Sequence, residues 1–310
     1  MGDWTTSTDP LLLRIAATTV ATPDLDASEA DYARWLGYRT VERGIVDVVL
    51  AESWGTPAAA GARTCTMTPA GEGDVFMRLV ETPAVPGYRP LTTFGWNAFE
   101  IIVDDVHALA ARLAGSGFAH LGGPRALQFM PSIVAMQVAG RGGECLYFTM
   151  ESGDRAASIL PPPSGFVGRT FIVVAAGEDF SRMLRWYVDR FALRERPVRQ
   201  SKIGIIQEAQ GLDADQTIEL SAIGMHERGN LVELDGYPTG PGRIAGPRPC
   251  APGHLPPGNA MVSIEIADLE PHVALALAPP AARNDAVYGG RRACTLLGPA
   301  GELIELIEAA

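Results

Sequence analysis

A pattern of apolar strand, acidic residue and amphipathic helix occurs four times in this chain of 310 residues. The four strand-to-helix segments begin at Thr18, Phe99, Phe171 and Val262. Each is followed by extended segments and ends in a turn and an apolar strand, as in GGECLYFTM and AGELIELIEAA. This β-α-β-β-β order, with a period of roughly 50 to 90 residues, indicates an internal repeat, so we expect function where repeats face each other.

The start of each expected helix is marked by an acidic residue. Asp24, Asp105, Asp179 and Asp268 stand at these positions, where a carboxylate caps the first backbone N–H groups. Apolar residues then follow at helical spacing, as at Met183, Trp186 and Tyr187, which is typical of one face packed on a sheet. We interpret these aromatic residues as core.

Composition excludes several function classes. The net charge of −11 and the pI near 5.0 argue against a nucleic-acid surface, which needs clustered Lys and Arg. The chain has no long apolar run, and its first residues, MGDWTTSTDP, carry acid where a signal peptide carries base. We therefore expect a cytoplasmic protein that acts on a small molecule, with no nucleic-acid or membrane partner, and we allow for a homodimer.

No cofactor is predicted from motifs. The four cysteines are far apart and form no C-x-x-C pair, so they indicate buried thiols rather than a zinc knuckle or a disulfide framework. Phosphate-cradling and dinucleotide-binding glycine patterns do not occur, and neither does a nucleophile elbow.

Two Pro/Gly-rich stretches divide the chain. The segment SILPPPSGFVG, with three consecutive prolines from Pro161, predicts a linker between two domains, residues 1–160 and 166–310. In this interpretation the first two modules pair with each other and the last two do the same. The second stretch, residues 238–258, predicts a long loop between the last two modules.

Three motifs carry a family resemblance. The pattern D-L-x-x-S-x-x-x-Y-x-x-x-L-G from Asp24 to Gly37, together with G-N-L-V-E-L at Gly229 and G-E-L-I-E-L at Gly301, resembles the vicinal oxygen chelate superfamily. That superfamily includes glyoxalases, bleomycin-resistance proteins and extradiol dioxygenases. The resemblance implies an α+β fold of four βαβββ modules, forming two cup-shaped, mostly antiparallel sheet domains flanked by helices, with ligands in the cups.

The resemblance also implies where a metal would bind. One ligand lies seven residues before the capping acid, and here these positions are Ala17, Ala98, Ile172 and Met261, none of which binds metals. The other ligand lies in the closing strand, where this chain has Arg78, Tyr147, Glu233 and Glu305. Because the histidines are missing, we expect no metal bound in the usual way.

Strand alternation predicts which carboxyl groups face the cups. It points Ala98, Glu100 and Ile102 inward in the second module, and Met261, Ser263 and Glu265 in the fourth. A carboxyl group in an apolar cup has a raised pKa, which suits acid-base catalysis near neutral pH. Glu305 and Glu100 are therefore catalytic candidates. Tyr147 is a third, because its phenol, at a closing-strand position, can donate to a substrate carbonyl.

A further set of residues is predicted to contact substrate. Its members are Arg78, Met261, Ile172, His226, His254, Glu233 and Glu265. Of the two cups we favour the one in the second half, with Glu305 as the proton-transfer group and with Met261 and Ile172 as the apolar wall that raises its pKa. An ion pair with an arginine such as Arg78 is the structural alternative for these carboxylates.

Three functions remain open from the sequence. The first is a metal-independent lyase or isomerase that transfers protons on a small apolar carbonyl or aromatic compound. The second is a metal-dependent, ring-cleaving dioxygenase-like enzyme with ligands recruited from elsewhere, and the third is a binding protein that sequesters small molecules.

Overall fold

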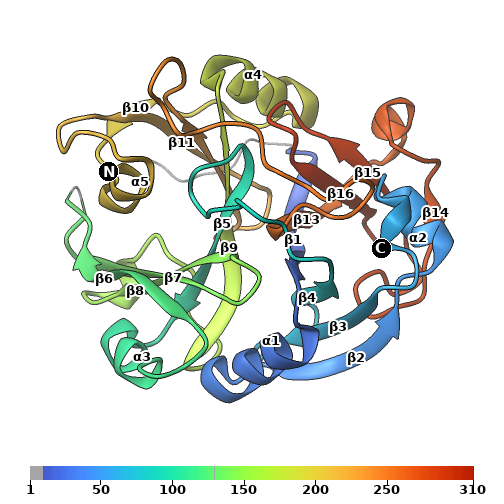
Figure 1. Ribbon diagram of the computed structural model, residues 1–310, viewed down its shortest axis with the longest axis horizontal. Coiled ribbons are helices and arrows are strands. Elements are labelled where there is room, and N and C mark those ends of the chain that lie inside the picture. Colours follow the sequence, from blue (N-terminus) through green and yellow to red (C-terminus); the bar gives the residue numbers. More distant parts are fainter. Residues whose placement is uncertain (1–9, 129) are drawn as a thin grey trace.

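A computed structural model describes residues 10–128 and 130–310 and contains the four predicted βαβββ modules (Figure 1). The N-terminal segment that bears on the signal-peptide prediction, residues 1–9, lies outside the described part of the chain. No helix in the described residues is long and apolar enough to cross a membrane.

The strands form two curled sheets of eight strands each. Sheet 1 has, in spatial order, β14 (Ala281–Ala282), β15 (Arg292–Leu297), β16 (Leu303–Glu308), β13 (Gly258–Ile266), β1 (Leu12–Thr22), β4 (Phe76–Glu81), β3 (Arg63–Thr68) and β2 (Arg39–Ile45). Sheet 2 has β10 (Arg199–Ser201), β11 (Ile218–Gly224), β12 (Leu231–Gly236), β9 (Val167–Gly177), β5 (Gly95–Val103), β8 (Cys145–Glu151), β7 (Ile133–Ala139) and β6 (Ala119–Ala126).

The helices are short, and all but one follow the first or second strand of a module; the exception, η3 (Arg155–Ala157), follows the closing strand β8. They are α1 (Leu25–Asp31) with the π-helical turn η1 (Tyr32–Leu36), α2 (Val48–Ser53), η2 (Pro57–Ala59), α3 (Val106–Arg112), η3 (Arg155–Ala157), α4 (Phe180–Phe191), α5 (Gly204–Gln210) and η4 (Glu270–Leu275). The predicted caps form at α1, α3 and α4, where Asp24, Asp105 and Asp179 accept backbone N–H groups. Asp268 accepts the N–H of Glu270 at 3.0 Å and opens only the 3₁₀ helix η4.

The predicted pairing of modules within the sheets is wrong. Sheet 1 joins modules 1 and 4, and sheet 2 joins modules 2 and 3. The first strands of partner modules meet at the centre of each sheet, antiparallel, β1 with β13 and β5 with β9. The proline stretch therefore connects β8 to β9 within sheet 2 and does not separate two sheets, because prolines stop a strand without deciding which strands pair.

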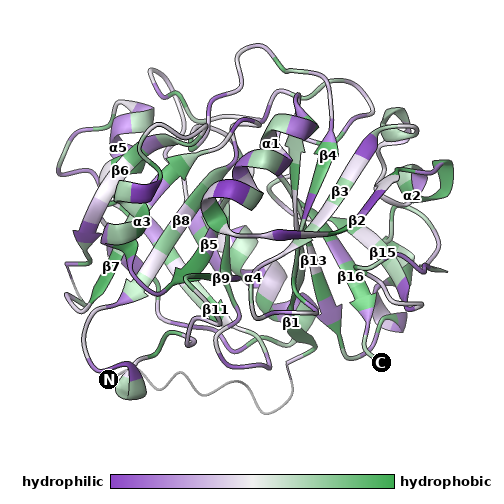
Figure 2. Cartoon of the chain, turned by 90° about the horizontal axis from the view of Figure 1, so that it is seen from below, coloured by the Kyte–Doolittle hydropathy of each residue, from purple (hydrophilic) through white to green (hydrophobic). Residues whose placement is uncertain are grey.

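Within each module the closing strand is parallel to the first strand, and the other pairs are antiparallel. The mostly antiparallel, cup-shaped sheets are thus confirmed. The central strands β5 and β13 are buried along nearly their whole length, and hydrophobic and hydrophilic residues are interspersed in them (Figure 2).

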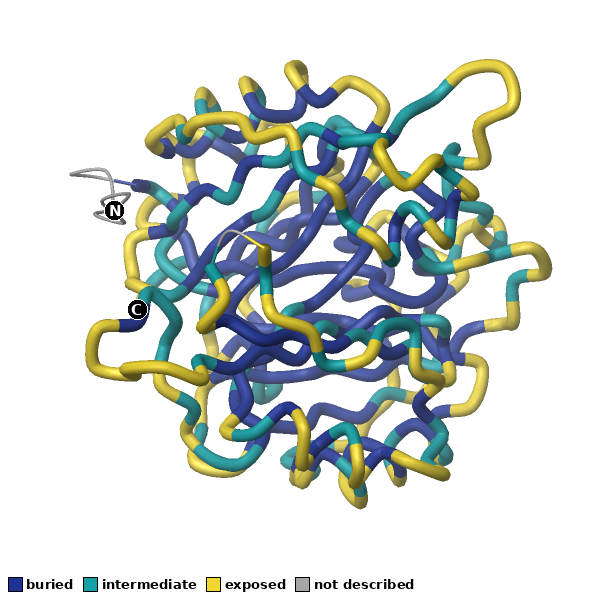
Figure 3. The backbone as a smooth tube through the Cα atoms, turned by 90° about the vertical axis from the view of Figure 1, so that its left-hand side faces the viewer, coloured by how far each residue is buried: buried dark blue, intermediate teal, exposed yellow. Residues whose placement is uncertain are grey.

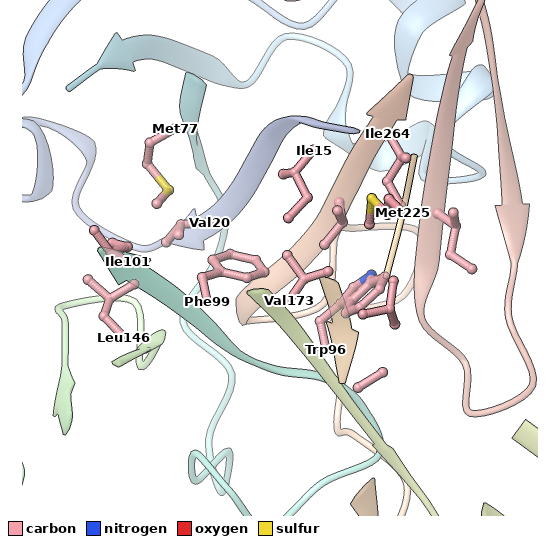
Figure 4. Close-up of a cluster of buried hydrophobic side chains, with 14 of the residues drawn as sticks. Ile15, Val20, Met77, Trp96, Phe99, Ile101, Leu146, Val173, Met225 and Ile264 are labelled. Atoms are coloured by element: carbon pink, nitrogen blue, oxygen red, sulfur yellow. The ribbon is translucent and has the colours of Figure 1, made fainter. Parts of the chain in front are cut away.

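One large apolar cluster covers the convex faces of both sheets. It includes Ile15, Met77 and Ile264 from sheet 1 and Phe99 and Val173 from sheet 2, which lie close together in Figure 4. Buried backbone accordingly runs through the middle of the molecule, and exposed segments lie at its periphery (Figure 3). Helical aromatics such as Tyr187 and Phe191 belong to this cluster, so their interpretation as core is confirmed.

Two buried tyrosine–glutamate pairs link the sheets. The hydroxyl of Tyr32, in module 1, donates to Glu144 at the closing turn of module 2, at 3.1 Å. The hydroxyl of Tyr187, in module 3, donates to Glu302 at the closing turn of module 4, at 2.9 Å. Consecutive modules are therefore joined by helix-to-turn contacts, although they lie in different sheets.

Glycines make room for both carboxylates. A Cβ at Gly140 would lie 1.9 Å from a Glu144 oxygen, and one at Gly298 would lie 2.1 Å from a Glu302 oxygen. Each carboxylate also accepts a backbone N–H of its own turn, from Gly142 or Ala300. Burial outweighs these hydrogen bonds and raises the pKa of each glutamate to about 7.

A carboxyl group with a raised pKa stabilises the fold while it is protonated. That contribution is complete below the ordinary glutamate value and is lost as the pH rises through about 7. Tyr32→Phe removes a donor to the ionised carboxylate and should cost about 1–3 kcal/mol of unfolding free energy at pH 8. The cost should be smaller at pH 6, where the carboxyl group is protonated, and denaturant unfolding at both pH values measures the difference.

Tyr38→Phe is the matched control. Its buried hydroxyl donates to the neutral carbonyl oxygen of Gly168 at 2.9 Å, so its loss should cost the same at both pH values. An equal cost of Tyr32→Phe at pH 6 and pH 8 would contradict the titration assigned to Glu144.

Candidate functional site

The concave face of each sheet carries predicted site residues, and we call these faces cup 1 (sheet 1) and cup 2 (sheet 2). Cup 1 contains Arg78, Met261, Glu265 and Glu305. Cup 2 contains Glu100, Tyr147, Ile172 and Glu233. The predicted grouping of Glu305 with Ile172 and Glu233 in one cup is wrong, because the modules pair differently.

A buried ion pair lies at the centre of cup 1. Arg78 Nη2 lies 3.0 Å from Glu305 Oε2, and both side chains are almost completely buried. Register brings the two together, since Arg78 lies beside Thr19 on β1 and Glu305 lies beside Ser263 on β13. Thr19 accepts a hydrogen bond from Arg78, and Ser263 donates to Glu305 at 2.5 Å.

Two aromatic side chains complete the network. Trp54 donates from Nε1 to Glu305 at 2.8 Å, and its ring lies under the Arg78 guanidinium at 4.6 Å. The Tyr288 hydroxyl accepts from Arg78 at 2.8 Å and donates to Glu305 at 2.5 Å. Neither aromatic residue has a periodic signal in the sequence, because both come from irregular segments beside the strands.

This network reverses the predicted titration of Glu305. Burial alone would raise the pKa of the carboxyl group, but the Arg78 charge and three donated hydrogen bonds outweigh it and lower the pKa. The prediction that an apolar wall raises the pKa of Glu305 is therefore wrong. Glu265 behaves in the same way, because Arg14 at 2.7 Å and Arg291 outweigh the effect of burial and lower its pKa.

In cup 2 the described residues place no cation beside the carboxyl groups. Thr149 donates to Glu100 at 2.5 Å, but burial prevails and raises the pKa of Glu100 to about 7. Burial and the charges of Asp235 and Glu100 raise the pKa of Glu233 well above its ordinary value. The expected pairing of Glu100 with Arg78 does not occur, since the two lie in different sheets, whereas Tyr147 lies beside Glu100 in the strand register.

The surroundings of these carboxyl groups are largely apolar. Ala98, Ile172, Val174 and Leu231 belong to the apolar cluster of this face, with Ile205 of α5 packed against it. Glu100, Tyr147 and Glu233 nevertheless remain partly exposed. Asp235, which is not among the predicted site residues, is buried, and burial raises its pKa to about 8.

The two predicted histidines lie in loops. His226 is exposed, and its backbone N–H donates to Leu12 at the start of β1. His254 is half-buried and precedes Leu255, which packs in the apolar cluster of cup 1 with Met261. The long loop thus covers part of cup 1, where the carbonyl oxygen of Gly253 accepts the backbone N–H of Ala58 at 2.9 Å.

The residues at the predicted metal positions do not fit a divalent metal ion. In cup 1, Ala17 and Met261 offer no donor atom, and Arg78 brings a positive charge to the carboxylate that remains. In cup 2, Ala98 and Ile172 likewise offer none, which leaves Tyr147 and Glu233. Among residues 10–128 and 130–310, no group of three or more His, Cys, Asp or Glu side chains is placed to hold a metal ion.

Solved structures with a similar fold span nearly the whole chain. Glyoxalase I from Zea mays has a TM-score of 0.63 at 16% identity, covering 95% of this chain and 92% of that one. A putative dioxygenase from Bacillus subtilis has a TM-score of 0.61 at 12% identity, covering 97% and 86%. No family model matches the sequence, and no curated protein gives a significant match.

Both solved structures are of vicinal oxygen chelate proteins. The chain therefore has the fold of that superfamily, and the resemblance stated from its motifs is confirmed at this level. The identities are too low to transfer an activity, so function has to be argued from the two cups.

Breaking the ion pair of cup 1 should be costly. Glu305→Gln leaves the buried Arg78 charge without its counterion, and we expect a loss of about 3–5 kcal/mol of unfolding free energy at pH 7. Because the pKa of Glu305 is lowered, the stabilisation is present above the ordinary glutamate value and is lost as the pH falls through the folded-state value. Denaturant titration of the wild type and the variant measures both effects.

Asp104→Asn is the control, since the Asp104–Arg155 ion pair has the same charges with both side chains about half exposed. Its loss should cost less than about 1 kcal/mol. The double variant Arg78→Met, Glu305→Met should recover much of the stability lost in Glu305→Gln. Similar costs for Glu305→Gln and Asp104→Asn would show that the buried pair has no special role.

Proposed function

We propose that the chain is a metal-independent lyase or isomerase that transfers protons on a small, largely apolar carbonyl or aromatic compound bound in cup 2. The observation that carries the proposal is the Glu100 carboxyl group. It is partly exposed on an apolar sheet face, and its pKa is raised to about 7, within the range that suits a general base at neutral pH.

A second carboxyl group supplies the complementary role. Burial and the charges of Asp235 and Glu100 raise the pKa of Glu233 well above its ordinary value, which favours the protonated form of this group. Two carboxyl groups whose environments separate their pKa values can act as acid and base in one site. Glu100 would remove a proton from carbon, while Glu233 or the Tyr147 hydroxyl, whose pKa burial also raises, would donate to the oxygen of the carbonyl group.

The strand arrangement sets the separation of the two groups. Glu100 on β5 and Glu233 on β12 are separated by one strand, β9, so their backbones lie on the order of 10 Å apart. Ile172 and Val174 of β9 form the apolar floor between them. A small substrate lying across β9 would contact both carboxyl groups at once.

Unpaired polar atoms in the same cup support a polar group on the substrate. Asp235 Oδ1 and the Tyr237 hydroxyl are buried and have no hydrogen-bond partner in the described part of the chain. Buried polar groups of this kind are normally paired, so a bound molecule or water would complete them. Cup 1 offers less for proton transfer, because all of its central carboxylate oxygens are engaged.

Glu100→Gln keeps the shape of the side chain and removes its titration. We expect turnover to fall by roughly 10²-fold or more while substrate binding is largely kept. Proton exchange from small carbonyl compounds in D₂O, followed by NMR, detects the activity whatever the product is. In the wild type the rate should rise with pH through about 7, because the ionised form of Glu100 is the base.

Glu219→Gln is the matched control. Glu219 lies on β11 of the same sheet, and by strand alternation it points to the face opposite Asp235 and Glu233. Its substitution should leave exchange unchanged. Exchange that survives in Glu100→Gln would refute the assignment, and binding without any exchange in the wild type would favour a sequestering protein.

A further inference from the structure

A pocket opens into cup 1, away from the proton-transfer site proposed in cup 2. Its volume is about 430 Å³, within the usual range for small-molecule sites. It lies between β2 and β3 on one side and residues 281–285 on the other, with Arg78 and Trp54 among its lining residues. The segments β14 and α2, which contribute to its walls, lie side by side in Figure 1.

Most ionisable groups that line this pocket are already engaged. Glu42 accepts the backbone N–H of Ala286, Asp47 accepts that of Leu50, and Asp285 accepts that of Val287. Arg78 is held by Glu305 and Tyr288. Each of these side chains has a hydrogen-bond partner within the fold, and among the described residues none of the three carboxylates forms an ion pair.

Arg283 differs from these side chains because most of its hydrogen-bonding capacity is unused. Its side chain lines the pocket and only 9% of the residue is exposed, yet it makes one long hydrogen bond, from Nη2 to the carbonyl oxygen of Val49 at 3.4 Å. Its Nε atom is buried without a partner, and within residues 10–128 and 130–310 no carboxylate forms an ion pair with it. The guanidinium stacks near the Tyr288 ring at 5.7 Å, which fixes its place but does not neutralise it.

A buried cation without a counterion is unfavourable, and an anionic oxygen of a ligand would compensate it. Apolar side chains lie at the rim of the pocket, on either side of the exposed Asp47. Ile45 and Val49 line it and are 66% and 59% exposed, and the neighbouring Val48 is 60% exposed. The pocket thus combines one unsatisfied cationic donor at depth with an apolar surface at its mouth.

From this combination we propose that the pocket of cup 1 binds a small amphipathic carboxylate, with its carboxylate on Arg283 and its apolar chain or ring against Ile45 and Val49. The site is distinct from the carboxyl groups of cup 2 and does not depend on their function. A planar guanidinium presents paired N–H donors to a carboxylate, which explains why this anion is preferred over a neutral polar group.

Benzoate and its neutral analogue benzamide test the proposal. Benzoate at millimolar concentration should raise the melting temperature and shift the amide NMR signals of residues 45–49 and 281–285, whereas benzamide should do neither. Arg283→Met should weaken benzoate binding about tenfold or more. Ile45→Ser, at an exposed position where folding is not at stake, should also weaken it, through the lost apolar contact.

Arg63→Met is the control for charge, since Arg63 on β3 is paired with Asp26 and Glu81. Arg63→Met and Glu100→Gln should both bind benzoate like the wild type. Equal binding of benzoate and benzamide would overturn the proposal, and so would unchanged affinity in Arg283→Met and Ile45→Ser. A changed benzoate affinity in Glu100→Gln, in either direction, would place the anion in cup 2 and would overturn the proposal as well.

Discussion

Antiparallel pairing of first strands at the centre of each sheet determines the rest of the architecture. Because β1 pairs with β13 and β5 with β9, each cup takes its central side chains from two modules that are distant in sequence. Arg78 and Glu305 meet only through this pairing, and the same pairing places Glu100 and Glu233 on one face of sheet 2. The tyrosine–glutamate contacts then connect consecutive modules, Tyr32 to Glu144 and Tyr187 to Glu302, so that both sheets enclose one apolar core. The fold is held by two sets of contacts that join the modules in different orders.

The two cups share a backbone plan but differ in electrostatics. In cup 1 the closing strands bring an arginine and a glutamate, which neutralise each other and are enclosed by Trp54 and Tyr288. In cup 2 the closing strands bring Tyr147 and Glu233, and the first strand β5 adds Glu100. Two carboxyl groups therefore lie on this face, and the described residues pair neither with a cation. The same burial therefore has opposite effects on the carboxyl groups: the pKa of Glu305 falls, and those of Glu100 and Glu233 rise. Arg78 in place of Tyr147 contributes to this contrast, together with the hydrogen bonds that Ser263, Tyr288 and Trp54 donate to Glu305.

The sequence predicted what depends on local pattern. Four modules, capped helices at Asp24, Asp105 and Asp179, and inward-facing residues on the first strands all follow from spacing and alternation. The partner of each module did not follow, because strand alternation is the same whichever module lies alongside. That error placed Ile172 beside Glu305 and Glu100 near Arg78. Trp54, Tyr288 and Arg283 could not be selected either, since they come from irregular segments whose position is set by tertiary contacts. The pKa of a buried carboxyl group depends on the charged side chains beside it. Which side chains lie beside it is decided by the pairing of strands from modules distant in the sequence.

The carboxyl groups that stabilise the fold and those suited to proton transfer lie in different cups. The carboxylate that contributes most to a buried hydrogen-bond network, Glu305, is also the one least able to exchange protons, because four donors hold its ionised form. The carboxyl groups of cup 2 are the reverse, since each is destabilised when ionised and has few partners. Carboxyl groups with strongly raised pKa values are concentrated at sites that bind or transform a ligand. Their burial destabilises the fold, and contacts elsewhere must offset this cost. The apolar core shared by both sheets, with its inter-sheet tyrosine links, provides that compensation.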